Sequence, residues 1–187
     1  MIEAIKRFFQ RDQPVSADTL RVLMVCTANV CRSPAAEAVF RQKLQQAGLA
    51  QRVRVDSAGT HGYKTGEAPD PRAVAAGQKR GFELGKLRAR PVTAQDFERF
   101  DWVLAMDTDH LAWLQAKAAE TKATAPLQGP KIELLMNYAR RPLGLDSVPD
   151  PYYGGPSGFD RVFDLVEDAC DGLVARILAR EPGSKLD

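Results

Sequence analysis

The chain has 187 residues, of which 44% are hydrophobic and 27% are charged, and its formal net charge is +2. This composition is ordinary for a globular protein, and the length predicts one domain. No basic block stands beside aromatic residues, which argues against nucleic acid as a partner. Every apolar run is shorter than the about 20 residues of a membrane-spanning helix, so no transmembrane segment is expected. Three cysteines without paired spacing do not predict a disulfide framework.

Residues 1–20 differ in character from the rest of the chain. Apolar residues of Met1–Gln10 fall near one face of a short helix, which residues 13–18 then break. The segment lacks the continuous apolar stretch of a signal peptide, and its apolar area is small for binding to a membrane surface. We therefore expect residues 1–20 to be an N-terminal extension without an assigned function and residues 21–187 to be a single domain.

From residue 21 onward, strand and helix signals alternate, which is typical of a parallel sheet with helices on both faces. The expected strands are Arg21–Cys26, Val53–Ser57, Trp102–Met106 and Lys131–Leu135. The expected helices are Pro34–Ala47, one that begins at Pro71, Thr108–Ala119 and Phe159–Arg180. The predicted fold class is therefore α/β: a three-layer, doubly wound, four-stranded parallel sheet. Such sheets bind ligands at the carboxyl ends of their strands, and the loop after the first strand is such a place.

This loop reads Cys-Thr-Ala-Asn-Val-Cys-Arg-Ser from Cys26 to Ser33. A short turn from a strand into a helix can point its backbone N–H groups inward at the positive helix end and form an anion-binding nest. The Arg32 guanidinium adds a planar fork that matches two phosphate oxygens. The same positive surroundings favour the thiolate form of a cysteine. The turn therefore predicts a phosphate site with Cys26 as its nucleophile.

Taken singly, the two residues have ordinary alternatives. Cys26 could be a buried cysteine at a strand end, and Arg32 a surface charge. The residues that follow favour the functional reading: Ser33 is a good N-cap and Pro34 suits the first helical position, so a helix N-terminus is expected where the loop ends. Ser33 is also near enough in sequence to donate a hydrogen bond to the thiolate.

Two Asp-Pro dipeptides compete for the role of proton donor to a leaving oxygen. Asp70 precedes Pro71 and an apolar-periodic stretch, so we expect it to be the N-cap of a helix. Asp150 lies in a segment rich in Pro and Gly, where loops display catalytic groups. A solvated aspartate in a turn is the alternative for Asp150.

Residues Val25–Glu37 resemble the phosphate-binding loop of the low-molecular-weight protein tyrosine phosphatases. The resemblance continues through Asp56–Thr60, Ala68–Arg72, Arg88–Arg90, Val103–Asp107 and Asp150–Gly155. It covers most of residues 21–180, makes residues 21–187 a single phosphatase domain, and implies a flavodoxin-like sheet of strand order 2-1-3-4. Two positions depart from the family: Ala28, where the family most often has Gly and a methyl is expected to crowd the loop, and Leu87, where many relatives carry His.

The resemblance implies a role for each residue of the site. Cys26 is the nucleophile, Asp150 the general acid and Arg32 a ligand of the phosphoryl group, in a two-step reaction through a cysteinyl phosphate. The phosphate-binding residues are then Thr27, Ala28, Asn29, Val30, Cys31, Arg32 and Ser33, with Asn29 bracing the loop. Tyr63, Tyr152 and Tyr153 are candidates for the wall of the substrate slot, although tyrosines are also ordinary loop anchors.

The expected substrate is a phosphotyrosine-containing protein, with tyrosine kinases among the candidates. A protein arginine phosphatase is the alternative. Relatives that act on phosphoarginine carry Thr where this chain has Val30, and the Val30 side chain cannot hydrogen-bond a guanidinium nitrogen. Val30 therefore favours phosphotyrosine over phosphoarginine. Arsenate reductases of the same fold need further cysteines, and none lies between Cys31 and Cys170. A non-catalytic phosphate-binding module is expected to lack the thiol, the guanidinium or the carboxylate. A nucleotide-binding domain is expected to carry G-x-G-x-x-G after the first strand.

Further cysteine and histidine residues complete the predictions. Members of the family join the sulfurs that correspond to Cys26 and Cys31 under oxidation, which makes Cys31 a redox candidate; a small buried apolar role is the alternative. Cys170 recurs with the apolar residues of the last helix and is expected in the core. No metal or cofactor is expected, because the two histidines, His61 and His110, lack ligand spacing and are expected at the surface. A free thiolate predicts a reducing compartment, so we expect the protein to be cytoplasmic.

Overall fold

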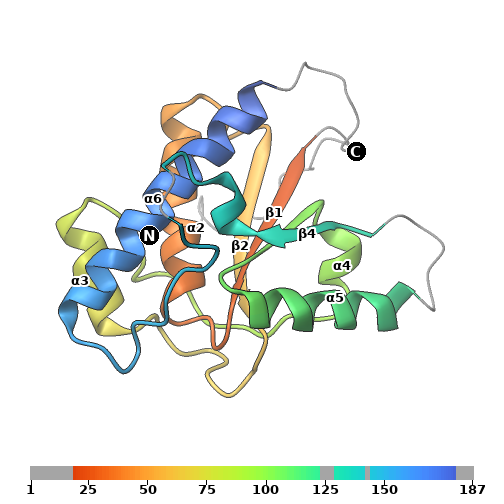
Figure 1. Ribbon diagram of the computed structural model, residues 1–187, viewed down its shortest axis with the longest axis horizontal. Helices are drawn as coiled ribbons and strands as arrows, with labels where there is room; N and C mark the ends of the chain where they lie inside the picture. Colours follow the sequence, from red (N-terminus) through yellow and green to blue (C-terminus); the bar gives the residue numbers. More distant parts are fainter. Residues whose placement is uncertain (1–18, 123–128, 142–143, 180–187) are drawn as a thin grey trace, which may run out of the picture.

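A computed structural model describes residues 19–122, 129–141 and 144–179 of the chain. Residues 1–18 of the expected N-terminal extension lie outside these ranges, and Leu20 is already the first residue of strand β1. The described elements follow in the order β1, α2, β2, α3, α4, β3, α5, β4, η1 and α6 (Figure 1). The alternation of strands and helices predicted from the sequence is therefore present.

Four parallel strands form one sheet in the order β2-β1-β3-β4, as predicted. They are β1 Leu20–Cys26, β2 Val53–Gly59, β3 Trp102–Ala105 and β4 Lys131–Leu134. Strand β1 has a partner on each side, since Val22 lies opposite both Val55 of β2 and Trp102 of β3. The strand order reverses between β1 and β3, so the loop after Cys26 begins at the topological switch point where such sheets bind ligands.

Helices cover both faces of this sheet, as predicted (Figure 1). They are α2 Arg32–Gln46, α3 Pro71–Lys79, α4 Asp96–Arg99, α5 Thr108–Lys122 and α6 Pro156–Leu178, with a 3-10 helix, η1, at Leu135–Tyr138. Helices α2 and α6 pack together on one face with α3 beside α6, and α4 and α5 lie on the other face. Helices α4 and η1 are absent from the predicted elements because four residues are too few to show a helical repeat. No described helix is both long enough and apolar enough to cross a membrane.

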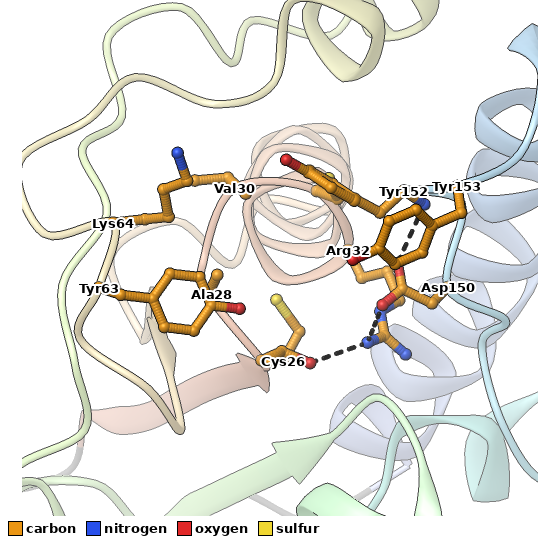
Figure 2. Close-up of a pocket in the computed structure, with 11 residues that line it drawn as sticks. Cys26, Ala28, Val30, Arg32, Tyr63, Lys64, Asp150, Tyr152 and Tyr153 are labelled. Atoms are coloured by element: carbon orange, nitrogen blue, oxygen red, sulfur yellow. Dashed lines mark hydrogen bonds and ion pairs between the residues drawn. The ribbon is translucent and has the colours of Figure 1, made fainter.

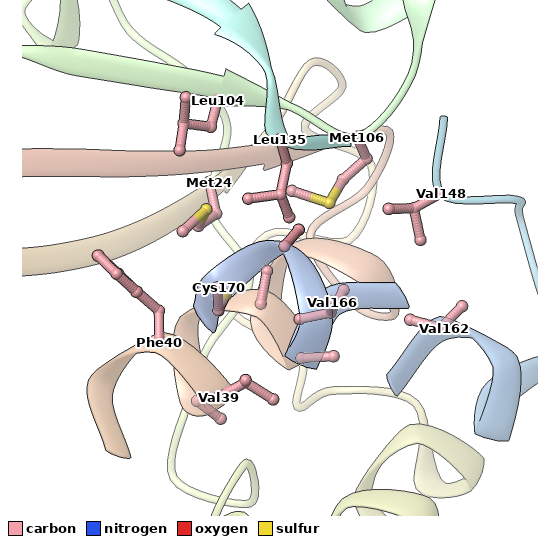
Figure 3. Packing of buried hydrophobic residues seen from close by; sticks show 14 of the residues in the cluster. Met24, Val39, Phe40, Leu104, Met106, Leu135, Val148, Val162, Val166 and Cys170 are labelled. Atoms are coloured by element: carbon pink, nitrogen blue, oxygen red, sulfur yellow. The ribbon is translucent and has the colours of Figure 1, made fainter. Parts of the chain in front are cut away.

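Successive residues of β1 point to opposite faces of the sheet and enter two separate cores. Val22 and Met24 pack on the side of α2 and α6. Leu23 and Val25 pack on the side of α4 and α5, and all four side chains are fully buried. Figure 3 shows Met24 facing Cys170 of α6, which lies in the core as predicted. Because β1 is enclosed on both faces, the loop at its end starts from a rigid support.

The start of helix α2 differs from the prediction. The helix begins at Arg32, its N-cap residue is Cys31, and no side chain caps it. Ser33, predicted to be the N-cap, is instead inside the first turn, and Pro34 follows it there rather than at the first position. The Ser33 hydroxyl is fully buried and bonds to the loop and to β2, which explains why it does not cap the helix.

Helix α3 begins as predicted. The Asp70 carboxylate accepts a hydrogen bond from the backbone N–H of Arg72 at 2.8 Å, and Pro71 is in the first turn. Asp70 also accepts from the Arg72 guanidinium through both of its oxygens. These bonds from Arg72, stronger than the opposing effect of burial, lower the pKa of the Asp70 carboxyl below its ordinary value. Asp70 is therefore an ionised helix cap.

Candidate active site

A pocket of about 420 Å³ opens at the carboxyl end of β1. Its lining residues are Cys26, Thr27, Ala28, Val30, Cys31, Arg32, Tyr63, Lys64, Asp150, Tyr152 and Tyr153. Figure 2 shows Cys26 at the floor, with Tyr63 and Lys64 on one side and Asp150, Tyr152 and Tyr153 on the other. The pocket thus brings together the predicted thiol, guanidinium, carboxylate and tyrosines, and it adds Lys64, which the sequence interpretation missed.

The Cys26 sulfur points into this pocket (Figure 2) and has a hydroxyl neighbour. Its Sγ atom lies 3.1 Å from Ser33 Oγ, and Cys26 is 3% exposed. Ser33 Oγ also donates to the carbonyl oxygen of Ala58 at 3.2 Å. The single hydroxyl proton can serve only one acceptor at a time, so it turns to Cys26 when that sulfur is ionised and needs a donor.

Asn29 braces the loop from inside. Its backbone has a φ of +58°, in the left-handed region that asparagine tolerates. The Asn29 amide nitrogen donates to Ser33 Oγ at 2.9 Å and to Ser57 Oγ at 2.8 Å, and its amide oxygen accepts from the backbone N–H of Arg90 at 3.0 Å. One side chain therefore ties the loop to α2, to β2 and to the segment before α4.

This network extends to a buried carboxylate that the sequence interpretation missed. Ser57 donates to Glu37 Oε2 at 2.6 Å, and Arg41 forms an ion pair with the other oxygen of Glu37. Glu37 is 2% exposed, and this burial raises the pKa of its carboxyl against the opposing charge of Arg41. The four-residue spacing of Glu37 and Arg41 is the only sequence signal of the pair, and nothing in it points to Ser57.

The Arg32 guanidinium is held from several directions at the edge of the pocket. Its Nη1 donates to Asp107 Oδ2 at 2.7 Å and to the carbonyl oxygen of Val148 at 3.1 Å. Its Nη2 donates at 3.2 Å to Thr27 Oγ1 and to Asp150 Oδ2. Arg32 is only 3% exposed, so its charge is compensated by carboxylates rather than by water. Asp107 belongs to the motif Val103–Asp107, but nothing in that motif indicated its contact with Arg32.

Asp107 is itself held by a buried histidine. His110 is 5% exposed, which corrects the expectation of a surface residue; His61 is exposed, as expected. The His110 ring is enclosed because α5 turns it towards the loop after β1, where Nε2 lies 2.9 Å from Thr27 Oγ1. Burial of Asp107 acts to raise its pKa, but its contacts with His110 and with the Arg32 guanidinium outweigh burial and hold that pKa well below its ordinary value.

Asp150, and not Asp70, presents its carboxylate to the pocket. The Asp150 side chain is 49% exposed, and one oxygen faces Arg32 while the other accepts from the backbone N–H of Tyr152 at 3.1 Å. Asp70 is bound to Arg72, and its backbone N–H donates to the carbonyl oxygen of Val30 at 2.8 Å. The two Asp-Pro dipeptides therefore differ: Asp70 caps α3, as predicted, and also bonds to the loop, whereas Asp150 borders the pocket.

The three candidate wall tyrosines differ in how firmly they are held. Tyr152 is 40% exposed, and Arg72 lies 5.5 Å from its ring centroid and donates to its carbonyl oxygen at 3.0 Å. Tyr153 is 96% exposed and packs edge-on against the Tyr152 ring at a centroid distance of 5.1 Å. Tyr63 is 65% exposed on the opposite side. Tyr152 is thus the best supported aromatic wall of the pocket.

Gly59, at the end of β2, lets that strand approach the loop after β1. A Cβ atom on Gly59 would lie 2.7 Å from the carbonyl oxygen of Thr27 and 3.0 Å from the carbonyl carbon of Ala28. The next residue, Thr60, donates its backbone N–H to the carbonyl oxygen of Cys26 at 2.8 Å. The backbone at Ala28 does not require glycine, because Asn29 is the only non-glycine with a positive φ among the described residues. The Ala28 methyl packs against the core and also lines the pocket.

Both cysteines of the loop are free thiols and buried. Burial, with smaller contributions from Asp70 and Cys26, raises the pKa of the Cys31 thiol to about 12. Cys31 is therefore protonated at neutral pH. Within the described ranges, no group of three His, Cys, Asp or Glu side chains is arranged to hold a metal ion.

Comparisons with known proteins agree with this geometry. The family model for low molecular weight phosphotyrosine protein phosphatases matches residues 21–182. A low molecular weight protein-tyrosine-phosphatase of Streptomyces coelicolor is 43% identical over 166 residues, which is 88% of this chain and 98% of the relative. A crystal structure of a protein tyrosine phosphatase from Entamoeba histolytica superimposes with a TM-score of 0.77 at 37% identity, covering 86% of this chain and 97% of that one. The crystal structure of a Drosophila arginine phosphatase gives a TM-score of 0.78 at 31% identity, with 87% and 100% covered. The chain belongs to the low-molecular-weight protein tyrosine phosphatase family.

Proposed function

We propose that this protein hydrolyses phosphotyrosine in proteins through a cysteinyl-phosphate intermediate. One observation carries the proposal: Arg32 borders the same pocket as the Cys26 thiol and donates at 3.2 Å to Asp150, which is 118 residues away in sequence. A nucleophile, a cation and a carboxyl group around one cavity are the groups that phosphoryl transfer without a metal requires.

In the first step, the Cys26 thiolate attacks phosphorus in line with the ester oxygen. The S–P bond forms, the P–O bond to the phenol breaks, and protonated Asp150 donates its proton to the departing oxygen. In the second step, Asp150 accepts a proton from water, the resulting hydroxide attacks phosphorus, and the S–P bond breaks. Cys26 leaves as a thiolate with Ser33 as its hydrogen-bond donor, at the observed separation of 3.1 Å.

The phosphoryl group is bound by the loop and by Arg32. Backbone N–H groups between Thr27 and Ser33 and the Arg32 guanidinium are the donors for its three equatorial oxygens. Asn29, which bonds to α2, β2 and the segment before α4, keeps these donors in place before substrate arrives. Preorganised donors of this kind are the main source of transition-state stabilisation in phosphoryl transfer.

Aromatic side chains support a phosphotyrosine substrate. Tyr63 stands on one side of the pocket, and Tyr152 and Tyr153 on the other, so a phenyl ring can lie between them. Val30 lines the same pocket and has no group that hydrogen-bonds a guanidinium. The similarity to an arginine phosphatase keeps phosphoarginine as the alternative substrate. A phosphotyrosine-containing protein, such as a tyrosine kinase, is the proposed partner, and the cytoplasm is the proposed location.

The domain organisation is part of the proposal. Residues 1–20 are proposed as an N-terminal extension and residues 21–187 as a single phosphatase domain. The family match over residues 21–182 supports this division, although Leu20 belongs to strand β1.

Hydrolysis of p-nitrophenyl phosphate tests the mechanism. We expect the wild-type protein to be active and inhibited by vanadate, Cys26→Ser to be inactive, and Asp150→Ala to be slowed about a hundredfold, within the range for general acid catalysis. Asp160→Ala is the matched control, because Asp160 is 52% exposed, close to the 49% of Asp150, and lies outside the pocket. Full activity of Cys26→Ser would contradict the mechanism.

Paired peptides test the substrate. The same peptide carrying either phosphotyrosine or phosphoarginine should be hydrolysed faster in its phosphotyrosine form, and Val30→Thr should reduce that preference. Equal or faster turnover of the phosphoarginine peptide by the wild-type protein would replace the proposed substrate with the alternative one.

A further inference from the structure

Four side chains near the pocket form a closed ring of polar contacts. Arg32 Nη1 donates to Asp107 Oδ2 at 2.7 Å, and Asp107 Oδ1 lies 2.8 Å from Nδ1 of His110. On the other side of the imidazole, Nε2 lies 2.9 Å from Thr27 Oγ1. Thr27 Oγ1 in turn accepts from Arg32 Nη2 at 3.2 Å, which closes the ring. The ring joins the loop after β1, helix α2, the loop after β3 and helix α5.

The contacts assign each proton of the ring. Nδ1 of His110 faces a carboxylate oxygen, which would repel a nitrogen lone pair, so Nδ1 carries the proton. Nδ1 has no partner in hydrogen-bond geometry, so its contact with that oxygen is electrostatic rather than a hydrogen bond. With the proton on Nδ1, Nε2 acts as the acceptor. Arg32 has only donors, so the Thr27 hydroxyl accepts from Arg32 and gives its own proton to Nε2.

We propose that His110 is a positioning residue for the phosphatase reaction, acting on Arg32 through Thr27 and Asp107. This inference rests on the function proposed above. The imidazole receives the Thr27 proton, so the lone pair of Oγ1 stays directed at Arg32 Nη2. On the Nδ1 side, the imidazole keeps Asp107 in contact with Arg32 Nη1. The guanidinium is thereby held in one plane from both terminal nitrogens before substrate binds, with its orientation fixed by a residue that touches no substrate.

Burial makes this ring important for the site. His110 and Arg32 are at most 5% exposed, and water cannot replace a lost partner at such positions without rearrangement. If the imidazole were absent, the Thr27 hydroxyl would have no acceptor on that side and could rotate, and Asp107 would lose one of its two side-chain partners. Arg32 would then be held by Val148 and Asp150, and Asp150 is half exposed and loses and regains a proton in the proposed reaction.

Three variants of His110 separate the two sides of the imidazole. In His110→Phe both nitrogens are lost and the ring volume is kept. In His110→Asn an amide nitrogen takes the place of Nδ1 towards Asp107, and in His110→Gln an amide group takes the place of Nε2 towards Thr27. We expect the Phe variant to lower kcat for p-nitrophenyl phosphate about tenfold, the effect of one buried hydrogen bond in a transition state, and to change KM less than about twofold. The Asn and Gln variants should each recover part of kcat.

His61→Phe is the matched control. His61 is the second of the two histidines and is exposed, and its side chain contacts Thr60 and Tyr63 rather than the ring of four residues. Its backbone N–H donates to the carbonyl oxygen of Thr27, and the substitution keeps both this bond and an aromatic ring beside Tyr63, so the kcat of His61→Phe should equal that of the wild-type protein. The same variant leaves His110 as the only imidazole. Long-range ¹H–¹⁵N correlation spectra of the ¹⁵N-labelled protein then report its tautomer, and we expect the proton on Nδ1.

The outcomes separate this inference from the proposed function. A wild-type protein without phosphatase activity would contradict the proposed function, and the tautomer measurement would still test the assignment of protons in the ring. Activity in the wild-type protein together with an unchanged kcat in folded His110→Phe would overturn the inference. So would a proton on Nε2 instead of Nδ1, or Asn and Gln variants as slow as Phe. If His110→Phe does not fold, the comparison of Asn, Gln and wild type decides.

Discussion

Ser33 Oγ lies 3.1 Å from Cys26 Sγ and has a fixed set of other partners, since it accepts from Asn29 at 2.9 Å and faces the carbonyl oxygen of Ala58 at 3.2 Å. The hydroxyl is therefore polarised by a donor on one side and has a choice of two acceptors on the other. The direction of the Ser33 hydroxyl proton, towards Cys26 or towards Ala58, therefore depends on whether Cys26 is charged. The contact also explains why Ser33 is inside the first turn of α2 instead of capping it.

Ser33→Ala removes the one side-chain hydroxyl that lies within hydrogen-bond reach of the Cys26 sulfur among the described residues. We expect kcat to fall between about tenfold and a hundredfold, the range for a hydrogen bond to a charged group. The second step should be affected as well, because Cys26 leaves from phosphorus as a thiolate. A burst of p-nitrophenol ahead of slow turnover in rapid-mixing experiments would show this. Ser157→Ala, at an exposed serine of α6, is the control. An unchanged kcat in Ser33→Ala would show that the contact plays no part in the reaction.

Gly59→Ala tests the close approach of β2 to the phosphate-binding loop. Its Cβ would lie 2.7 Å from a backbone oxygen, so the loop itself has to move. We expect a loss of about 1 to 3 kcal/mol in the free energy of unfolding, as in overpacked cores, and a loss of activity larger than this destabilisation explains. Gly85→Ala is the matched control, because no atom lies within 4 Å of its added Cβ and its φ is not positive. Urea unfolding and steady-state kinetics measure the two effects. Equal behaviour of the two variants would contradict the prediction.

Oxidation by hydrogen peroxide tests the redox role of Cys31. We expect peroxide to convert the Cys26 thiolate to a sulfenic acid, and the Cys31 thiol to displace water from it and form a disulfide. Because burial raises the pKa of Cys31 to about 12, Cys31 is not itself the first target of peroxide. Activity of the wild-type protein should therefore return with dithiothreitol. In Cys31→Ser the loss should be permanent, with an added mass of two or three oxygens on Cys26. Cys170→Ala should recover like the wild type, and permanent loss in the wild type would rule out protection by Cys31.

Asp168 makes the stability of the fold depend on pH. Its carboxylate accepts from the backbone N–H groups of Arg140 and Arg141 and from the Arg141 side chain. Burial acts to raise its pKa, but these bonds outweigh it and lower the pKa below the ordinary value of 3.8. A lowered pKa in the folded state adds stability above the ordinary value and loses it as pH falls through the folded value.

We therefore expect Asp168→Asn to lower the free energy of unfolding at pH 7 by about 1 kcal/mol, a value reduced for the screening of the exposed Arg141 guanidinium. The difference between the variant and the wild type should shrink as pH falls below 4. Urea unfolding between pH 7 and pH 3 measures it, with Asp146→Asn, at an exposed aspartate, as the control. A difference that stays constant with pH would show that the charge of Asp168 is not responsible.

Local patterns in the sequence were sufficient to predict the sheet and the phosphate-binding loop. The predicted strands agree with the observed ones to within two residues at each end, because buried parallel strands read as short apolar runs between turn signals. The pairing of Cys26 with Arg32 could be predicted for a similar reason. Both residues belong to one short turn, and their spacing is a property of the chain itself. The strand order came from the family resemblance.

The surroundings of that turn were decided by the tertiary structure. Asp107 and His110 reach Arg32 and Thr27 across 75 and 83 residues, and Ser57 reaches Asn29 across 28. No local periodicity encodes such meetings, because they depend on which strands lie side by side and where each one ends. The amino-acid sequence by itself thus determined a thiol and a guanidinium on one loop of an α/β sheet. Folding alone decided that a buried histidine, an aspartate and a distant carboxyl group surround them, because only the parallel packing of β1 with β2 and β3 brings those segments to the same edge.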